Sequence, residues 1–280
     1  MNDLRNAFPG PGLRRDTRPP PPDALWAPLL RVEDLSLSFD GVQALSQVSF
    51  EVKAGQVCSI IGPNGAGKSS LLNILSGLYR PDAGVVTFAG ERLPRLAPGE
   101  GARRGLGRTF QNIALFGGMT VVDNVLTGAA LSARASFLEN AFRLGRARRE
   151  EQAHLARVAE ILAFLGLEAH AQTRVSQLPY GLQKRVELAR ALAAEPRLLL
   201  LDEPMAGMTF AEKLEMSRFV VRANEELGVT VLLIEHDIGV VMDLSDQVVV
   251  LDYGRKIADG APEQVRADPE VVRAYLGEAA

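Results

Sequence analysis

One stretch, GPNGAGKSS at residues 62–70, constrains the fold of this chain more than any other. Gly62, Gly67, Lys68 and Ser69 match the spacing G-x-x-x-x-G-K-S/T. In this pattern glycines let the backbone curl, so that several N–H groups point at one anion. A helix that begins at such a loop adds the positive end of its dipole. The stretch therefore predicts a phosphate-binding loop between a strand and a helix.

The flanking sequence favours this interpretation over a glycine-rich turn without a ligand. The apolar run VCSII precedes the loop and the apolar stretch LLNILSGL follows it, as a buried strand and a helix would. We expect Lys68 to lie outside any core and to reach the β- and γ-phosphates of a nucleotide, while the Ser69 hydroxyl completes the shell of a Mg²⁺ ion. The candidate nucleotide-binding residues are those of the loop: Gly62, Pro63, Asn64, Gly65, Ala66, Gly67, Lys68, Ser69 and Ser70.

Composition narrows the possible classes of function. With 280 residues, 47% of them hydrophobic, the chain can form one large domain or a core with a subdomain. A net charge of -3 gives no reason to expect a nucleic-acid partner. The single cysteine, Cys58, lies in the apolar run before the loop, where we expect a small buried residue. No run of about eighteen apolar residues occurs, so we expect no bilayer span.

The first 28 residues differ in amino-acid composition from the rest of the chain. They hold seven of the 16 prolines, mixed charge and no continuous apolar centre, so they do not resemble a secretory signal. With so little apolar surface to bury, we expect residues 1–28 to form a disordered tail. A proline-rich docking segment is the alternative.

The rest of the chain predicts a β portion followed by a helical insert. LLRVEDLSLSF and ALSQVSFEV alternate as half-buried antiparallel strands do, and GVVTFAG reads as another short strand. Over residues 121–171 the pattern changes to helical spacing, with Leu155, Val158, Leu162 and Leu165 forming an apolar stripe. The charged stretch RLGRARREEQ is most simply a solvated helix face, with an interaction surface as the alternative.

Two continuous apolar strands, RLLLLDEP and GVTVLLIEHD, follow the insert and are separated by a helical stretch at 211–227. This strand, helix, strand order is typical of a buried parallel sheet. Ligands of open α/β sheets bind beyond the carboxyl ends of the strands. We therefore expect the polar residues at these two ends to lie on the same rim as the phosphate loop: Asp202, Glu203, Glu235 and His236.

The charged strand ends suit phosphate chemistry. Two adjacent carboxylates after an apolar strand are costly to bury without a cation or a reaction to serve. Asp202 suits Mg²⁺ ligation, directly or through water, and Glu203 suits deprotonating an attacking water. A helix cap is the alternative for such a pair, but the phosphate loop on the same sheet favours catalysis. His236 can donate a hydrogen bond to a γ-phosphate.

The segment QLPYGLQKRVELARALAAEPRLLLLDEP makes a family resemblance specific. With the phosphate loop, FQNIALF, LLLLDEP and IEHD in that order, residues from about 30 to 277 resemble the nucleotide-binding subunit of an ATP-binding cassette (ABC) transporter. The resemblance implies an α/β fold with a P-loop NTPase core, in which a RecA-like parallel sheet carries an antiparallel β subdomain and an inserted α-helical subdomain. It places the domain at 29–277 and the helical insert at about 121–195.

The resemblance also implies roles for individual residues. Phe39 matches the aromatic residue that stacks on adenine. Gln111 matches the glutamine that senses Mg²⁺ and the attacking water and that lies at the contact with the membrane subunits. Gly181 matches the second glycine of the signature motif LSGGQ, which touches the γ-phosphate bound by the opposite subunit. In the same way, Asp202 matches the Mg²⁺-site aspartate, and Glu203 and His236 match the catalytic glutamate and the switch histidine.

The resemblance implies a set of partners. Family members form head-to-tail dimers that bury two ATP molecules, so we expect a homodimer or a heterodimer with a related ATPase subunit. We also expect two transmembrane permease subunits and, for an importer, an extracytoplasmic substrate-binding protein. The chain would then be a peripheral protein at the cytoplasmic face of the inner membrane, with no nucleic-acid partner.

The chain departs from the family pattern at two motifs. The signature reads LPYGL, so Pro179, Tyr180 and Leu182 replace the serine, the first glycine and the glutamine. A proline cannot donate the hydrogen bond of the serine hydroxyl, although the Gly181 amide and the helix terminus remain. The loop after the carboxylates reads MAGMT, with Thr209 where many members have aspartate or asparagine.

Three segments suggest a branch of the family. The YG signature, FQNIALFGGMTVVDNV and the ending PEVVRAYLGE resemble the branched-chain amino acid transporter ATPases, a branch that also includes uptake systems for urea and other small solutes. A non-transport cassette ATPase that acts on another macromolecular machine is the alternative. A nucleotide kinase could share the phosphate loop but would not explain the signature helix.

Overall fold

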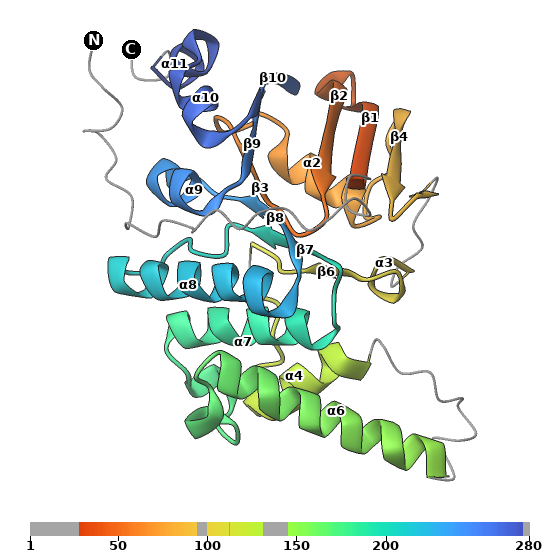
Figure 1. Ribbon diagram of the computed structural model, residues 1–280, viewed down its shortest axis with the longest axis vertical. Helices are drawn as coiled ribbons and strands as arrows, with labels where there is room; N and C mark the ends of the chain where they lie inside the picture. Colours follow the sequence, from red (N-terminus) through yellow and green to blue (C-terminus); the bar gives the residue numbers. More distant parts are fainter. Residues whose placement is uncertain (1–27, 94–99, 112, 131–144, 277–280) are drawn as a thin grey trace.

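The computed structural model describes residues 28–93, 100–111, 113–130 and 145–276 (Figure 1). The segment expected to be a disordered tail lies outside the described residues, except for Pro28. That residue begins the first strand, so the boundary predicted at 28 is one residue too late. None of the helices in the described part combines the length and hydropathy that a bilayer span requires.

A six-stranded sheet forms the centre of the molecule, with the order β10-β9-β3-β8-β7-β6. Neighbouring strands from β9 to β6 pair in parallel, and β10 runs antiparallel to β9. Every residue of β3, β7 and β8 is buried, as expected of strands covered on both faces. The strands are β3 (Val57–Ile61), β6 (Leu106–Arg108), β7 (Leu198–Asp202), β8 (Thr230–Ile234), β9 (Gln247–Asp252) and β10 (Arg255–Gly260).

A second, antiparallel sheet has the order β2-β1-β4-β5. It contains the three strands predicted from alternation, and the fourth is a short edge strand. The strands are β1 (Pro28–Phe39), β2 (Val42–Lys53), β4 (Ala83–Phe88) and β5 (Glu91–Arg92). The inward faces of β1, β2 and β4 form one core cluster with Cys58 of β3, which is buried as predicted.

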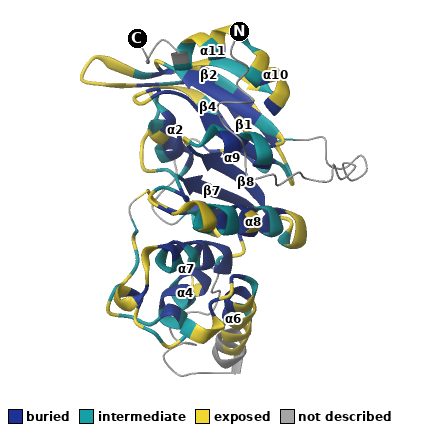
Figure 2. Cartoon of the chain, turned by 90° about the vertical axis from the view of Figure 1, so that its left-hand side faces the viewer, coloured by how far each residue is buried: buried dark blue, intermediate teal, exposed yellow. Residues whose placement is uncertain are grey.

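Helices cover the central sheet and form a separate region at one end of the molecule. Figure 2 shows α4, α6 and α7 gathered at this end, opposite the antiparallel sheet. The helices are α2 (Lys68–Leu75), α3 (Glu100–Arg103), α4 (Val121–Ala129), α6 (Gly145–Phe164), η2 (Glu168–His170), η3 (Val175–Gln177), α7 (Tyr180–Ala193), α8 (Phe210–Leu227), α9 (Ile238–Leu244), α10 (Pro262–Ala267) and α11 (Pro269–Leu276).

The apolar stripe predicted on α6 is partly wrong. Val158, Leu162 and Leu165 are buried, but Leu155 is 47% exposed. The first turns of α6 run beyond the ends of α4 and α7 (Figure 1). Ile161 is buried in its place, which gives the spacing i, i+3, i+4, i+7 of a packed helix face. The side chains of 145–151, within the charged stretch, lie outside the described residues.

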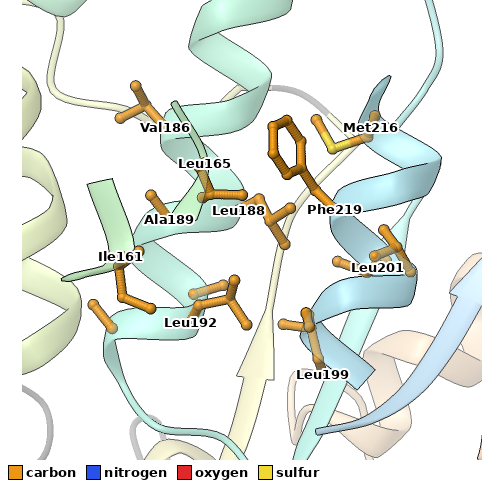
Figure 3. Close-up of a cluster of buried hydrophobic side chains, with 14 of the residues drawn as sticks. Ile161, Leu165, Val186, Leu188, Ala189, Leu192, Leu199, Leu201, Met216 and Phe219 are labelled. Carbon is orange, nitrogen blue, oxygen red and sulfur yellow. The ribbon is translucent and has the colours of Figure 1, made fainter. Parts of the chain in front are cut away.

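One apolar cluster joins the helical region to the central sheet (Figure 3). Leu165, just after the end of α6, packs with Leu188 of α7, and the cluster continues through Phe219 of α8 to Leu199 and Leu201 of β7. Burying each such side chain contributes about 1.5–3 kcal/mol relative to leaving it in water. Helix α7 is therefore tied by packing to β7, the strand that leads into the two carboxylates.

Candidate active site

The phosphate loop has the conformation that its glycines predict. Gly62 has φ 150° and Gly67 has φ 97°, and both are backbone conformations that favour glycine. A Cβ atom at Gly62 would collide with the carbonyl oxygen of Leu251, and one at Gly67 would collide with that of Ala44. The loop is therefore held by close backbone contacts with two neighbouring segments, which a side chain would prevent.

Lys68 is buried, in contrast to the prediction that it lies outside any core. Its side-chain ammonium donates hydrogen bonds to the carbonyl oxygens of Gly62 at 2.7 Å and Pro63 at 2.8 Å, and the residue is 6% exposed. These bonds close the loop around the lysine stem. Helix α2 begins at Lys68, and no side chain caps its N-terminus. Its first amide groups are thus available to an anion.

A cavity of about 290 Å³ brings the phosphate loop together with residues from distant parts of the sequence. Its position at the carboxyl ends of β3, β7 and β8 agrees with the predicted rim. Glu203, Gln111 and His236 line the cavity opposite the loop. The remaining lining residues are Ala44, Asn64, Gly65, Ala66, Gly67, Lys68, Ser69 and Ser70.

Glu203 is held from both sides. Its Oε1 lies 2.7 Å from Nε2 of His236, and its Oε2 accepts a hydrogen bond of 3.1 Å from the Gln111 amide. The backbone of Glu203 has φ 48°, a strained conformation for a residue with a side chain, and its N–H donates to the Ile234 carbonyl. This arrangement places a carboxylate at the cavity in a fixed orientation, as a general base requires.

Asp202 lies behind the cavity and does not line it. It is 4% exposed, and its Oδ2 accepts a hydrogen bond of 3.2 Å from Nη2 of Arg108. Within the described part of the chain, Oδ1 of Asp202 is buried and has no hydrogen-bond partner. Burial raises the pKa of Asp202, and the neighbouring guanidinium opposes that shift. An orphaned carboxylate oxygen fits a cation or its bound water.

The other donors also fit Mg²⁺. No group of three or more His, Cys, Asp or Glu residues in the described ranges could hold a metal on its own. Mg²⁺ is commonly bound by one or two protein oxygens together with phosphate oxygens and waters. Ser69 and Gln111 at the cavity, with Asp202 behind it, match that sparse donor set.

Arg108 is a site residue that the sequence reasoning missed. Its guanidinium donates to Asn73 Oδ1 at 2.8 Å, to the Leu72 carbonyl at 3.3 Å and to the Ser76 hydroxyl, besides Asp202. It therefore ties the last turn of α2 to the end of β7. The signal was an arginine within the strand-like stretch LGRTF, where an apolar residue would be ordinary.

Glu235 was placed on the rim by its position, but its role was not predicted. Its carboxylate is buried and accepts backbone hydrogen bonds from Met205 at 2.9 Å and from His236 at 3.2 Å. Burial raises its pKa, and these two hydrogen bonds oppose the shift. Lys213 of α8 and Asp237 form an ion pair beside this contact, at 3.0 Å. The loop after Glu203 is thus joined to the turn that carries His236.

Phe39 and Gly181 do not line the cavity of this chain. Phe39 is partly exposed and packs edge-on against Tyr79, with ring centroids 5.3 Å apart. Gly181 is buried in the first turn of α7, where a Cβ atom would collide with the Glu212 carboxylate. Within this chain, the glycine leaves room for the Glu212 carboxylate.

Comparisons with protein families support this reading of the site. Residues 45–206 match the family described as ABC transporter, a range that includes the phosphate loop, Gln111 and both carboxylates. Residues 255–280 match the family described as branched-chain amino acid ATP-binding cassette transporter.

Several characterised proteins are similar over most of the chain. BraF of Pseudomonas aeruginosa, a high-affinity branched-chain amino acid transport ATP-binding protein, is 41% identical over 90% of this chain and 99% of its own length. LivG of Escherichia coli, with the same description, is 39% identical over the same shares. CysA of Bradyrhizobium diazoefficiens, a sulfate/thiosulfate import ATP-binding protein, is 37% identical over 89% of this chain and 69% of its own length.

Solved structures agree with the fold. The ADP conformation of an ATP-binding cassette of an ABC transporter has a TM-score of 0.78 and 33% identity, covering 90% of this chain and 99% of that one. A nucleotide-free cassette from an ABC transporter has a TM-score of 0.77 and 32% identity, covering 89% and 99%. A dimeric bacterial ABC transporter cassette has a TM-score of 0.71 and 27% identity, covering 83% and 98%. These likenesses confirm the predicted fold class.

Proposed function

Because the chain belongs to the ATP-binding cassette transporter family, we propose that it is the ATP-hydrolysing subunit of an importer for branched-chain amino acids or a related small polar solute. The observation that carries the proposal is the Glu203 carboxylate, held by Gln111 and His236 across one cavity from the phosphate loop. A site that only bound ATP would not require this carboxylate.

ATP hydrolysis follows from the positions of these groups. The loop amides and Lys68 hold the β- and γ-phosphates of ATP, and the positive end of α2 favours their charge. Glu203 takes a proton from a water, whose oxygen attacks the γ-phosphorus while the bond to the β-phosphate oxygen breaks. The products are ADP and inorganic phosphate. Positioning and charge stabilisation supply most of the rate enhancement in such reactions.

The residues around the γ-phosphate have two further roles: they orient Glu203 and they would bind Mg²⁺. His236 keeps Glu203 oriented through Nε2 and, when ATP is bound, would donate that N–H to the γ-phosphate instead, while Gln111 holds the other carboxylate oxygen. Ser69, Asp202 and Gln111 would hold Mg²⁺. The ion, when bound, neutralises phosphate charge in the transition state.

Two copies of this ATPase, or one copy and a related subunit, would complete each site. Gly181 lies in the first turn of α7 and does not line its own cavity, which supports a role opposite the nucleotide of a partner. The dimeric cassette among the similar structures supports the same arrangement. Phe39, which packs beside Tyr79, would stack on adenine.

The proposed assembly has two membrane-embedded permease subunits, and each would dock on one copy of the ATPase. The docking site would be a second, mostly apolar cavity of about 450 Å³. It lies between the end of α2, strand β6 and helices α4 and α7. Leu78 and Phe110 line it and are exposed, which favours an apolar occupant such as a permease helix. Phe110 directly precedes Gln111, so docking would connect to the catalytic cavity. The chain would then work at the cytoplasmic face of the inner membrane.

The identity of the transported solute is the most specific part of the proposal. The C-terminal match and the descriptions of BraF and LivG support branched-chain amino acids. CysA shows that a relative of similar identity serves sulfate and thiosulfate. The permeases and an extracytoplasmic binding protein would select the solute. This chain would affect solute choice only through the partners that it binds.

Reconstitution tests the proposal. The chain and the membrane proteins that co-purify with it would be placed in vesicles and supplied with ATP, Mg²⁺, the extracytoplasmic binding protein and labelled leucine or sulfate. We expect ATP-dependent leucine uptake that Glu203→Gln abolishes. Uptake of sulfate alone would overturn the solute assignment. Co-purification with a ribosome or another soluble machine, without permeases, would favour the non-transport alternative.

A further inference from the structure

Tyr180, which replaces the first glycine of the signature motif, contacts the loop that follows Glu203. Its phenolic Oη donates a hydrogen bond of 3.2 Å to the carbonyl oxygen of Ala206. Its ring covers Gly207, which has φ 75° and where a Cβ atom would lie 3.2 Å from Cε1 of the tyrosine. The contact joins the first residue of α7 to the loop of residues 203–209 within one subunit.

We propose that Tyr180 is a positioning residue that couples the hydrolytic site of its own subunit to the placement of Gly181 at the site opposite. The inference rests on the proposed function, because it requires two subunits that share their sites. It assigns a role to the altered signature motif, which the family pattern left unexplained.

The first end of the loop is fixed to the catalytic residues. The Glu203 N–H donates to the carbonyl of Ile234 at 3.0 Å, and the Met205 N–H donates to the Glu235 carboxylate. The other oxygen of that carboxylate accepts the N–H of His236. A movement of His236 or Glu203 during the reaction is therefore transmitted to the backbone that Tyr180 holds.

The second end of the loop is fixed to the start of α8. Thr209 and Glu212 form a capping box there, with Glu212 accepting from the threonine N–H at 2.9 Å and from its hydroxyl at 2.7 Å. The Glu212 carboxylate also packs against Gly181. The first turn of α7 thus contacts the loop through the Tyr180 hydroxyl, and it contacts the α8 residue that caps the end of the loop through Gly181.

The Tyr180 hydroxyl connects the start of α7 to the loop by a side-chain hydrogen bond. Pro179 is the N-cap residue of α7, and no side chain caps the helix. The phenol remains a donor at ordinary pH, because burial and the Glu187 charge raise its pKa. The ring adds a second restraint on Gly207, so the removal of the hydroxyl alone tests the hydrogen bond while the packing stays.

Tyr180→Phe is the direct test, and Tyr253→Phe is the matched control. Tyr253 is 88% exposed in the turn between β9 and β10. ATPase rate would be measured against Mg-ATP concentration for both variants. A single neutral hydrogen bond corresponds to roughly a fivefold effect. We expect Tyr180→Phe to lower kcat by about three- to tenfold and to reduce the Hill coefficient toward one, with Tyr253→Phe unchanged.

Two further measurements separate positioning from a merely structural role. Binding of a fluorescent ADP to the single chain and the Tm should be the same in Tyr180→Phe and wild type, since the bond touches neither the phosphate loop nor the core. In the Glu203→Gln background, where hydrolysis is blocked, Tyr180→Phe should raise the ATP concentration for half-maximal dimer formation. Light scattering reports that concentration.

An unchanged kcat and Hill coefficient in Tyr180→Phe would overturn the inference. Loss of Tm and ADP affinity in proportion to kcat would overturn it too, because that pattern is a general loosening of the fold. Failure of Glu203→Gln alone to dimerise at saturating ATP is a different result. It would remove the two-subunit mechanism itself, and the coupling role with it.

Discussion

Oε1 of Glu203 and Nε2 of His236 lie 2.7 Å apart, although 33 positions separate the two residues in the chain. Their strands explain the contact. β7 and β8 pair in parallel with Asp202 opposite Ile234, so the residues just beyond the two strands emerge side by side. The backbone bond from the Glu203 N–H to the Ile234 carbonyl then fixes the turn. Sheet register and this backbone bond thus place a carboxylate and an imidazole side by side on the rim.

Glu203→Gln should keep ATP binding and nearly stop turnover. The amide can still accept one hydrogen bond, but it cannot accept a proton from water. Loss of a general base typically costs ~10²- to 10⁴-fold, on the order of 3 to 5 kcal/mol of activation free energy. Phosphate release measures turnover, and light scattering with Mg-ATP should detect a persistent dimer. Glu263→Gln, an exposed position in α10, is the control. Turnover near wild type with no dimer would contradict the assignment.

Lys68 should be needed for both binding and stability. Lys68→Ala removes two hydrogen bonds from an ammonium to loop carbonyls, at 2.7 and 2.8 Å, as well as the counter-charge for phosphates. Hydrogen bonds that involve a charged group contribute about 1.5–3 kcal/mol each. We therefore expect a lower Tm without nucleotide, and loss of fluorescent-ATP binding. Lys68→Met keeps the buried stem and should lose binding with a smaller fall in Tm. An unchanged Tm in Lys68→Ala would show that the loop holds its shape without the ammonium.

Sequence reasoning was sufficient where a property depends on local pattern. The strand and helix on either side of residues 62–67, the alternating strands β1 and β2 and the apolar strands β7 and β8 follow from spacing and periodicity, and the structure confirms them. Placing Glu203 and His236 on one rim needed only the rule that parallel strands end together.

Contacts between distant segments could not be predicted in the same way. Arg108 and Asp202 are 94 positions apart, and nothing in either local pattern indicates that they pair. Leu155 fits the period of a buried stripe but is 47% exposed, while Ile161 is buried. The burial of Lys68 likewise depends on how the loop folds around its own stem. Each case turns on tertiary neighbours, which a period in the sequence does not specify.

Glu235 should make stability fall as pH rises above the ordinary glutamate range. Burial raises its pKa in the folded state, so the folded chain holds this proton more tightly than the unfolded chain does. That contribution is complete below the unfolded pKa of about 4.3. It is lost as pH rises through the folded value. The Tm of wild type minus that of Glu235→Gln should therefore decrease between about pH 4 and the folded pKa.

Glu226→Gln gives the control of opposite sign. A hydrogen bond from Arg222 lowers the Glu226 pKa, so its contribution appears above the unfolded pKa and is lost on acidification. Its difference curve should rise with pH below the unfolded pKa of about 4.3 and be flat above that value, where the curve of Glu235 falls. A difference for Glu235→Gln that is flat or rising over the same range would show that the two backbone hydrogen bonds to the carboxylate outweigh its burial.

Gly128 should be required for the packing of α4 on α7. A Cβ atom there would collide with the carbonyl oxygen of Arg190, so Gly128→Ala must push the helices apart. Such overpacking typically costs about 1–3 kcal/mol. Gly118→Ala is the matched control, since a Cβ there meets nothing within 4 Å. Urea unfolding should show the loss in Gly128→Ala alone. Equal stability of the two variants would mean that α4 and α7 can separate without cost.

Arg108→Met should be among the most destabilising single substitutions at the site. It leaves the Asp202 carboxylate buried without its cation, and breaking a buried ion pair in this way costs about 3–5 kcal/mol. Adding Asp202→Asn removes the uncompensated charge and should restore part of that loss. Arg31→Met breaks an exposed pair with Glu51 and should cost less than about 1 kcal/mol. Urea unfolding of the four chains gives these values. Two results would contradict this prediction: a loss in Arg108→Met no larger than that in Arg31→Met, or a larger loss when Asp202→Asn is added. Either result would show that Arg108 is not the counter-ion of Asp202 and that its main contacts are the acceptors at the end of α2.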